Sequence, residues 1–145
     1  MALHFRHEVL CGAYFFRWTA PPTEEDAEAC IRLLSALGPH EKIITVGVAP
    51  LTADLPTPAE RLALRRILDE LKPHCEHYYT VVSGNGARHK LLRGFLTAVS
   101  AVTSFFDGTQ SIHATIDEIA DDLGRRLRTD GRALVADAKA RGLVV

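Results

Sequence analysis

The start of the chain alternates between apolar and polar side chains. Over residues 3–9 the odd positions are Leu, Phe, His and Val, whereas the even positions are His, Arg and Glu. This period of two is typical of a half-exposed strand. Residues 13–19 are rich in aromatic side chains, which favour a second strand. With Gly12 in the short turn between them, we expect a β-hairpin that ends before Pro21 and Pro22.

Helical and extended patterns alternate after the hairpin. Apolar residues recur at helical spacing, and shorter runs of β-branched or aromatic residues lie between them. The pattern predicts helices over 23–37, 57–72, 92–102 and 115–123, a short helix over 133–140, and strands over 42–48, 77–83 and 111–114. The order β-β-α-β-α-β-α-β-α predicts an α/β fold with a mostly parallel sheet and an antiparallel N-terminal strand.

Length and hydropathy indicate the domain organisation. The 145 residues suffice for one hydrophobic core. We expect a single domain over residues 1–128 and a C-terminal helical tail over residues 129–145. The last four residues, 142–145, are Gly-Leu-Val-Val, which is apolar enough for the tail to dock on the domain.

The charge balance narrows the class of partner. Lys and Arg number 17 against 18 Asp and Glu, so the net charge of −1 is too neutral for a protein that coats nucleic acid or an anionic membrane. No apolar run approaches the roughly 20 residues that span a bilayer. The first residues also lack the apolar core of a signal peptide, so we expect a cytoplasmic protein without membrane insertion. Cys11, Cys30 and Cys75 are widely spaced and imply no disulfide framework.

The order of the elements resembles the STAS family, the sulfate transporter and anti-sigma factor antagonist domains, with their SpoIIAA-like relatives. The resemblance spans roughly residues 3–127, with the later strands at 43–48, 80–83 and 112–114. It implies a compact, right-handed winding of β-α units and a domain that binds a partner protein, or in some members a small ligand, without catalysing a reaction. In the sporulation antagonists, the loop before the second helix carries an Asp-Ser-Ser-Gly-like motif whose serine is phosphorylated by a partner kinase.

The corresponding segment here, residues 49–61, contains Thr52, Asp54 and Thr57 but no Asp-Ser-Ser-Gly sequence. Thr57 is followed by a proline and, three residues after Thr57, by a glutamate, which is the signature of a helix N-cap. A phosphate on Thr57 would also meet the N-terminus of a helix, with Arg61 one turn away. Both roles of Thr57 stay open, and the capping signature favours the role of helix cap. Thr52 is a second candidate phosphosite.

A second corner, residues 83–93, is rich in glycine and cations. Its Ser-Gly-Asn-Gly start lacks the spacing of a phosphate-binding P-loop, so a tight turn is favoured over an anion site. Arg88 and Arg93 can join Arg61 and Arg65 in one basic patch, which would suit an acidic surface on a protein. The resemblance and this patch together predict partner contacts through Asp54, Thr57, Arg61, Arg88 and Arg93.

The histidines and acids form no metal or catalytic motif. In the run from His74 to His77, neighbouring side chains of an extended segment point to opposite sides and cannot all meet one ion. A composite metal site would need a distant partner such as Cys11 or His113. No Gly-x-Ser-x-Gly elbow is present, and the clustered acids lie at helix starts, where the helix dipole accounts for them. We therefore expect no metal, no cofactor and no catalytic residue.

These observations lead to one favoured function and two alternatives. We expect a non-enzymatic cytoplasmic regulatory domain that binds another protein, a kinase-like or signalling partner, through residues 49–61, with phosphorylation as an optional gate. A domain that binds a small anion or a lipid-like molecule is the first alternative. An enzyme whose histidines and carboxylates are gathered by the fold is the second. The sequence is compatible with a monomer or a homodimer and predicts no nucleic-acid partner.

Overall fold

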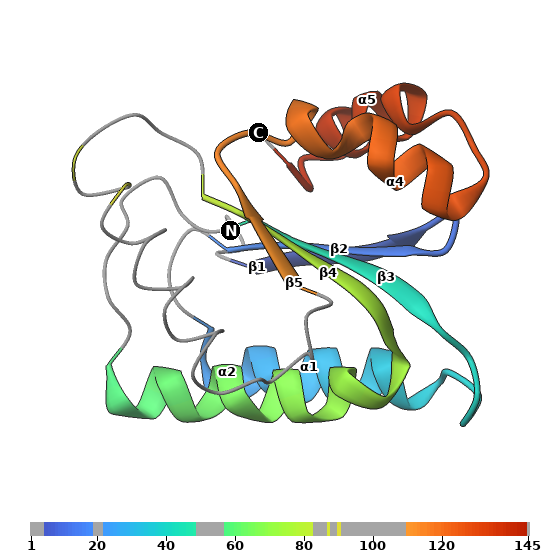
Figure 1. Cartoon of the computed structure of the whole chain (residues 1–145). Helices are drawn as coiled ribbons and strands as arrows, with labels where there is room; N and C mark the ends of the chain where they lie inside the picture. The colour runs from blue at the N-terminus through green and yellow to red at the C-terminus, as the bar shows by residue number, and fades with distance from the viewer. Residues whose placement is uncertain are drawn as a thin grey trace.

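A five-stranded sheet forms the centre of the protein (Figure 1). The computed structural model describes residues 5–18, 22–48, 57–82, 87, 90 and 110–144. The strands follow one another across the sheet in chain order: β1 (Phe5–Leu10), β2 (Ala13–Trp18), β3 (Ile43–Val48), β4 (Cys75–Val81) and β5 (Gln110–His113). β1 and β2 pair antiparallel, and the other neighbouring pairs are parallel. The α/β class and the mostly parallel sheet with an antiparallel N-terminal strand are confirmed.

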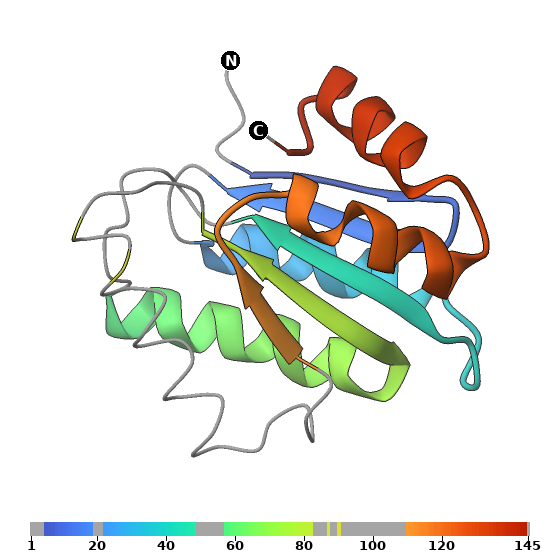
Figure 2. The same cartoon turned by 45° about the horizontal axis from the view of Figure 1, so that its top comes forward.

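Helices cover both faces of this sheet (Figures 1 and 2). α1 (Glu24–Ser35) and α2 (Pro58–Leu71) lie on one face, and α4 (Ala120–Leu127) and α5 (Gly131–Ala140) lie on the other. A 3-10 turn, η1 (Lys72–His74), follows α2, and a second one, η2 (Asp117–Ile119), precedes α4. The helix expected over residues 92–102 lies outside the described residues and stays a prediction.

The two helices of the first layer begin at the capping residues that the sequence indicates. The backbone N–H of Asp26 donates to Oγ1 of Thr23 at 3.3 Å, and the backbone N–H of Thr23 donates back to the Asp26 carboxylate at 2.8 Å. Thr57 and Glu60 form the same reciprocal pair at the start of α2. These capping boxes satisfy backbone donors that have no partner inside the helix.

The helix expected from residue 115 begins later than its sequence suggests. The backbone N–H of Glu118 donates to Oγ1 of Thr115 at 3.3 Å, but the Glu118 carboxylate accepts from the backbone N–H of Ala114 instead of returning to Thr115. The reciprocal half of the capping box is therefore missing. The chain first forms the tight turn η2, and α4 starts only at Ala120.

Alternation along β2 divides its aromatic side chains between two cores. Tyr14 and Phe16 pack against α1 and α2, whereas Phe15 packs beneath α4 and α5. All three are 2% exposed or less. Both faces of this strand are therefore covered by helices, and its aromatic residues serve packing.

The end of the chain completes the core beneath α4 and α5. Leu143 and Val144 are each only 3% exposed and belong to the same hydrophobic cluster as the residues of α4 and α5. Arg141 forms an ion pair of 2.7 Å with Glu8 of β1. The apolar C-terminal segment thus docks on the sheet, as its composition indicates.

Candidate functional site

Most of the residues proposed for partner binding or phosphorylation lie outside the described part of the chain. This group comprises Thr52, Asp54, Arg88 and Arg93, whose contacts stay predictions. Thr57 and Arg61 are described, and both are exposed at the start of α2. The Thr57 hydroxyl accepts a hydrogen bond from the backbone N–H of Glu60 at 3.2 Å, which confirms its role as the helix cap.

The exposed side of α2 combines one large apolar residue with two cations. Pro58, Arg61, Leu62 and Arg65 are exposed and follow the spacing i, i+3, i+4, i+7, so they share one face of the helix, here called the α2 outer face. Leu62 is 61% exposed, the largest value among the described large hydrophobic residues. Arg65 approaches Asp69 at 4.0 Å across exposed positions. The outer face therefore has an apolar centre with a cationic border.

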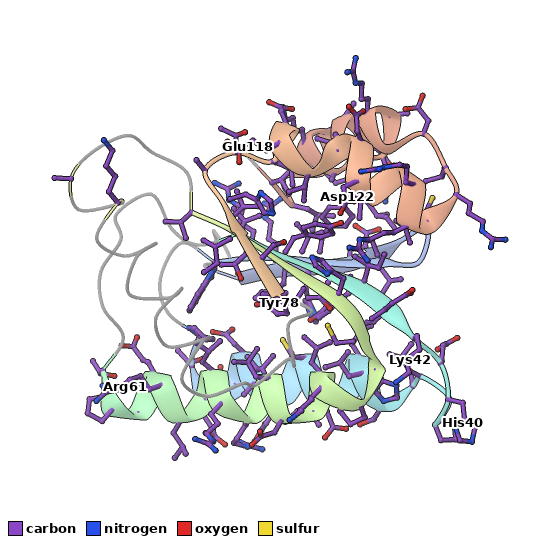
Figure 3. The ribbon with its side chains drawn as sticks, in the orientation of Figure 1. His40, Lys42, Arg61, Tyr78, Glu118 and Asp122 are labelled. Carbon is purple, nitrogen blue, oxygen red and sulfur yellow. The ribbon has the colours of Figure 1, made fainter. Side chains whose placement is uncertain are left out.

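Leu62 is a binding candidate that the sequence analysis did not single out. The buried residues of α2 are Ala63, Ile67 and Leu71, which form its inner stripe. Leu62 falls outside this stripe, and an apolar residue on the polar side of an amphipathic helix is the signal that identifies it. Figure 3 shows the neighbouring Arg61 in the layer of α1 and α2, across the sheet from Glu118 and Asp122.

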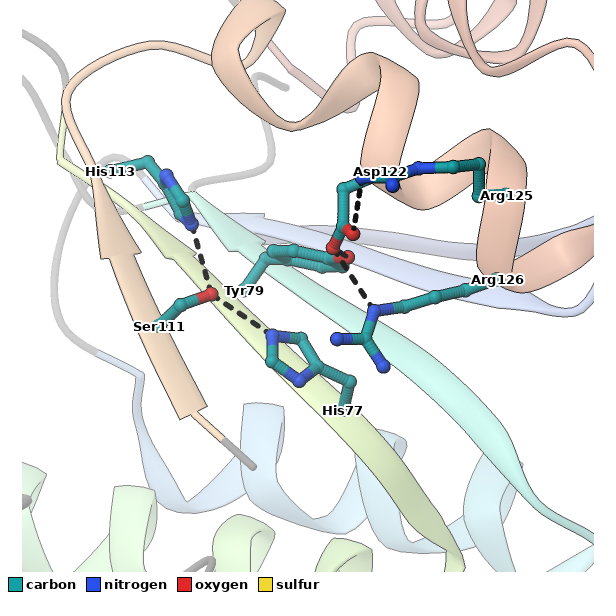
Figure 4. Close-up of polar contacts among 7 residues, drawn as sticks. All are labelled: His77, Tyr79, Ser111, His113, Asp122, Arg125 and Arg126. Atoms are coloured by element: carbon teal, nitrogen blue, oxygen red, sulfur yellow. Dashed lines mark hydrogen bonds and ion pairs between the residues drawn. The ribbon is translucent and has the colours of Figure 1, made fainter. Parts of the chain in front are cut away.

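A second group of polar residues lies between strands β4 and β5 and helix α4 (Figure 4). The parallel register places Tyr79 of β4 beside Ser111 of β5, and side chains two residues apart along each strand face the same side. Nε2 of His77 lies 3.0 Å from Oγ of Ser111, and Nε2 of His113 lies 2.9 Å from the same oxygen. Nδ1 of His113 lies 3.5 Å from the carboxylate of Glu118. We call His77, Ser111, His113 and Glu118 the histidine–serine chain.

A tyrosine–carboxylate–arginine group adjoins the histidine–serine chain. The hydroxyl of Tyr79 donates to the Asp122 carboxylate of α4. The same carboxylate accepts from Nε of Arg126 at 3.0 Å and from a guanidinium nitrogen of Arg125 at 3.1 Å. The hydrogen bond from Tyr79, followed by that from Arg126, lowers the pKa of Asp122 despite partial burial. This group anchors α4 to the sheet and keeps a negative charge at Asp122.

Burial governs the two titratable rings of β4. The pKa of Tyr79 is raised to about 12, first by burial and then by its hydrogen bond to Asp122. The rings of His77 and Tyr79 have centroids 4.4 Å apart. The pKa of His77 is lowered, first by burial and then by the positive charge of Arg126, while Asp122 opposes this shift. The ring of His77 is therefore kept neutral at neutral pH.

The lowered pKa of His77 predicts that the protein loses stability in mild acid. The unfolded chain takes up a proton on this histidine near pH 6.5, whereas the folded chain takes it up only at lower pH. The free energy of unfolding should therefore fall as the pH drops below this value. His7, whose pKa is also lowered by burial, adds to the same slope.

Urea unfolding at a series of pH values measures this slope. We expect His77→Gln to make the dependence shallower, and His77→Gln combined with His7→Gln to make it shallower still. His40→Gln, at an exposed position, is the matched control and should keep the wild-type slope. An unchanged slope in the double variant would contradict the prediction.

The histidines of the run from His74 to His77 have different partners in the structure. Nδ1 of His74 pairs with the backbone carbonyl of Glu41 at 2.9 Å, whereas Nε2 of His77 lies 3.0 Å from Oγ of Ser111. Burial raises the pKa of the intervening Cys75 to about 11, which disfavours its thiolate. Within the described ranges, no three His, Cys, Asp or Glu residues are arranged to hold a metal ion. Among the described helices, none is long and apolar enough to cross a membrane.

Comparison with known proteins finds no relative of this chain. No family model, curated protein or solved structure matches it significantly. Two features of the described residues bear on function, namely the α2 outer face and the histidine–serine chain. The sequence does not reveal the histidine–serine chain, because His77 and Ser111 are 34 positions apart and only the pairing of β4 with β5 brings them together. The Ser-x-His spacing on one strand was its only local signal.

Proposed function

We propose that this chain is a STAS-like regulatory domain that works in the cytoplasm by binding a partner protein through the α2 outer face. The observation that carries this proposal is Leu62, 61% exposed between Arg61 and Arg65 on the helix that follows the expected binding loop. The element order of the described residues is compatible with the STAS resemblance. We infer that the domain acts by recognition and that the α2 outer face itself performs no reaction.

The composition of the α2 outer face indicates the chemistry of its partner. Protein interfaces concentrate their binding energy in a few residues, among which arginine is enriched, around an apolar centre that excludes water. Leu62 supplies such a centre, and Arg61 and Arg65 supply the cations at its border. Arg61 has no ion-pair partner among the described residues, which leaves its charge available to a partner. An acidic protein surface with an apolar depression fits this arrangement.

The geometry of Thr57 argues for recognition by a preformed helix end, without a phosphate on that residue. The backbone N–H of Thr57 donates to the Glu60 carboxylate at 2.8 Å, so a negative charge already lies beside the Thr57 side chain. A phosphate on Thr57 would be repelled by this carboxylate. If phosphorylation gates binding, Thr52 is the better acceptor of the two, because Thr57 serves as the cap.

Affinity capture with matched surface variants tests the proposal. The wild-type chain, immobilised and exposed to extract of its own cells, should retain a partner that Leu62→Glu and Arg61→Glu retain at least about 10-fold less, the loss expected for a residue that contributes strongly to an interface. Val9→Glu changes the other large hydrophobic residue that is exposed in the described part of the chain, and Arg132→Glu changes an exposed arginine of α5. Both controls should bind as the wild type does.

The same variants distinguish a second copy of the chain from a different partner. Sedimentation of the purified protein should show a dimer that Leu62→Glu dissociates if the α2 outer face binds another copy. Equal capture by all variants, or capture of no protein together with a monomer in sedimentation, would contradict the proposed function.

A further inference from the structure

The histidine–serine chain lies across the sheet from the α2 outer face and does not depend on it. From its geometry we propose that Ser111 is a nucleophile that takes an acyl group from a small activated ester, with His113 as its general base and Glu118 as a positioning residue. This inference goes beyond the recognition function and departs from the sequence-based expectation of no catalysis. Because the two surfaces are separate, either proposal stands if the other fails.

Glu118 favours one direction for these hydrogen bonds. A carboxylate only accepts, so its position 3.5 Å from Nδ1 of His113 favours the tautomer that carries a proton on that nitrogen. Nε2 of the same ring is then the acceptor for the Ser111 hydroxyl at 2.9 Å. The Ser111 oxygen is left to accept from Nε2–H of His77 at 3.0 Å. The serine proton thus already points to a base, as nucleophilic catalysis requires.

The serine can be reached from solvent. Ser111 is half-buried, and the side chains of His113 and Glu118 are 24% and 49% exposed. His77, on the other side of the serine, is only 8% exposed. β5 is the outermost strand of the described sheet, and Figure 4 shows Ser111 on it between His113 and His77. The serine therefore lies between a buried histidine and a partly exposed one.

The proposed reaction is an acyl transfer to Ser111. As Oγ of Ser111 bonds to the ester carbonyl carbon, its proton passes to Nε2 of His113 and the carbonyl electron pair moves to the carbonyl oxygen. When the carbonyl re-forms, the bond to the leaving oxygen breaks, and that oxygen takes the proton from His113. Water then repeats the sequence on the acyl-serine, releases the carboxylic acid and restores Ser111.

The neighbouring residues stabilise the charges of this reaction. The Glu118 carboxylate faces the His113 ring and balances its positive charge while the ring holds the proton. Glu118 is itself held by the backbone N–H of Ala114 at 3.3 Å. His77 donates to the same serine oxygen and holds it beside His113.

Two probes test the inference on the full chain. An alkyl fluorophosphonate should label Ser111 with loss of fluoride, which peptide mass spectrometry locates, and p-nitrophenyl acetate should release p-nitrophenol. Ser111→Ala should abolish the fluorophosphonate adduct and lower the release of p-nitrophenol to that given by the other nucleophiles of the chain, such as Cys11, whereas Ser35→Ala, at an exposed position of α1, should keep both signals. His113→Gln should slow both reactions by roughly 10²-fold, the effect of losing a general base.

A test of the positioning role of Glu118 requires a variant that keeps the local structure. Glu118→Gln retains an oxygen that can accept from Ala114 but removes the charge that faces His113. We expect it to slow labelling without lowering the unfolding midpoint, and Glu118→Asp to restore part of the rate. Absence of the Ser111 adduct, equal labelling of Ser111→Ala, or an unchanged rate in His113→Gln would overturn the proposal.

If Ser111→Ala does not fold stably, Ser111→Cys tests the proposed nucleophile in its place. The substituted side chain retains a nucleophile of similar size at the same position. It should be acetylated by p-nitrophenyl acetate faster than the exposed Cys11 of the same chain, and His113→Gln should remove this advantage. Equal acetylation of the two positions would show that the site does not activate a nucleophile.

Discussion

Shortening Leu143 and Val144 to alanine together is expected to lower the free energy of unfolding by about 4 kcal/mol, which approaches the whole stability of many domains of this size. Both side chains are 3% exposed and lie in the core beneath α4 and α5. Their loss leaves a cavity between the end of the chain and the sheet. The C-terminal segment would then contribute to folding as much as an internal helix does.

Urea unfolding followed by circular dichroism measures this effect. Ala133→Ser and Ala136→Ser, at exposed positions of α5, are the matched controls and should change the midpoint little. If residues 129–145 were instead a separate tail on a domain that ends at residue 128, the double variant would unfold at the wild-type midpoint. That outcome would contradict the packing of the C-terminal segment.

Gly131→Ala is expected to cost about 3 kcal/mol, at the upper end of the range for overpacked sites. A Cβ at Gly131 would lie 1.8 Å from the backbone oxygen of Ala120 and 2.8 Å from the backbone nitrogen of Gly124. Because these neighbours are backbone atoms, no side-chain rotation can relieve the contact. The start of α5 would have to move away from α4, and the core beneath both helices would open.

Gly38→Ala is the control for replacing a glycine by an alanine where the added Cβ meets no neighbour. A Cβ at Gly38 meets no atom within 4 Å, so this variant should be neutral or more stable by a few tenths of a kcal/mol to about 1 kcal/mol. Thermal unfolding of the two variants beside the wild type gives the comparison. Equal midpoints for Gly131→Ala and Gly38→Ala would show that α4 and α5 do not pack through this glycine.

The elements that depend on neighbouring residues were predictable from the sequence. The hairpin follows from alternation and from a turn at Cys11 and Gly12, where Gly12 has a φ of 85° that glycine adopts readily. The starts of α1 and α2 follow from Thr23 and Thr57, because a capping box involves only residues three apart. Thr115 shows the limit of this rule, since its glutamate bonds one residue too early and α4 starts later.

The residues of the candidate sites also divide into those that the local sequence indicates and those that it does not. Arg61 and Thr57 were found by their position at a helix start, which is a local property, but the exposure of Leu62 depends on which side of α2 packs on the sheet. His77 and Ser111 carry no shared motif at all. Their contact exists because β4 and β5 pair in parallel with Tyr79 opposite Ser111.

The sequence by itself therefore determined the α/β class, the hairpin and the capped helices, because hydrophobic period, turn residues and caps act over a few residues. The tertiary structure alone decided which core Leu143 and Val144 join, that Leu62 is 61% exposed, and that Ser111 lies between two histidines. These three results depend on contacts between segments distant in the chain. Such contacts are set by the packing of whole faces and leave no periodic trace in the sequence.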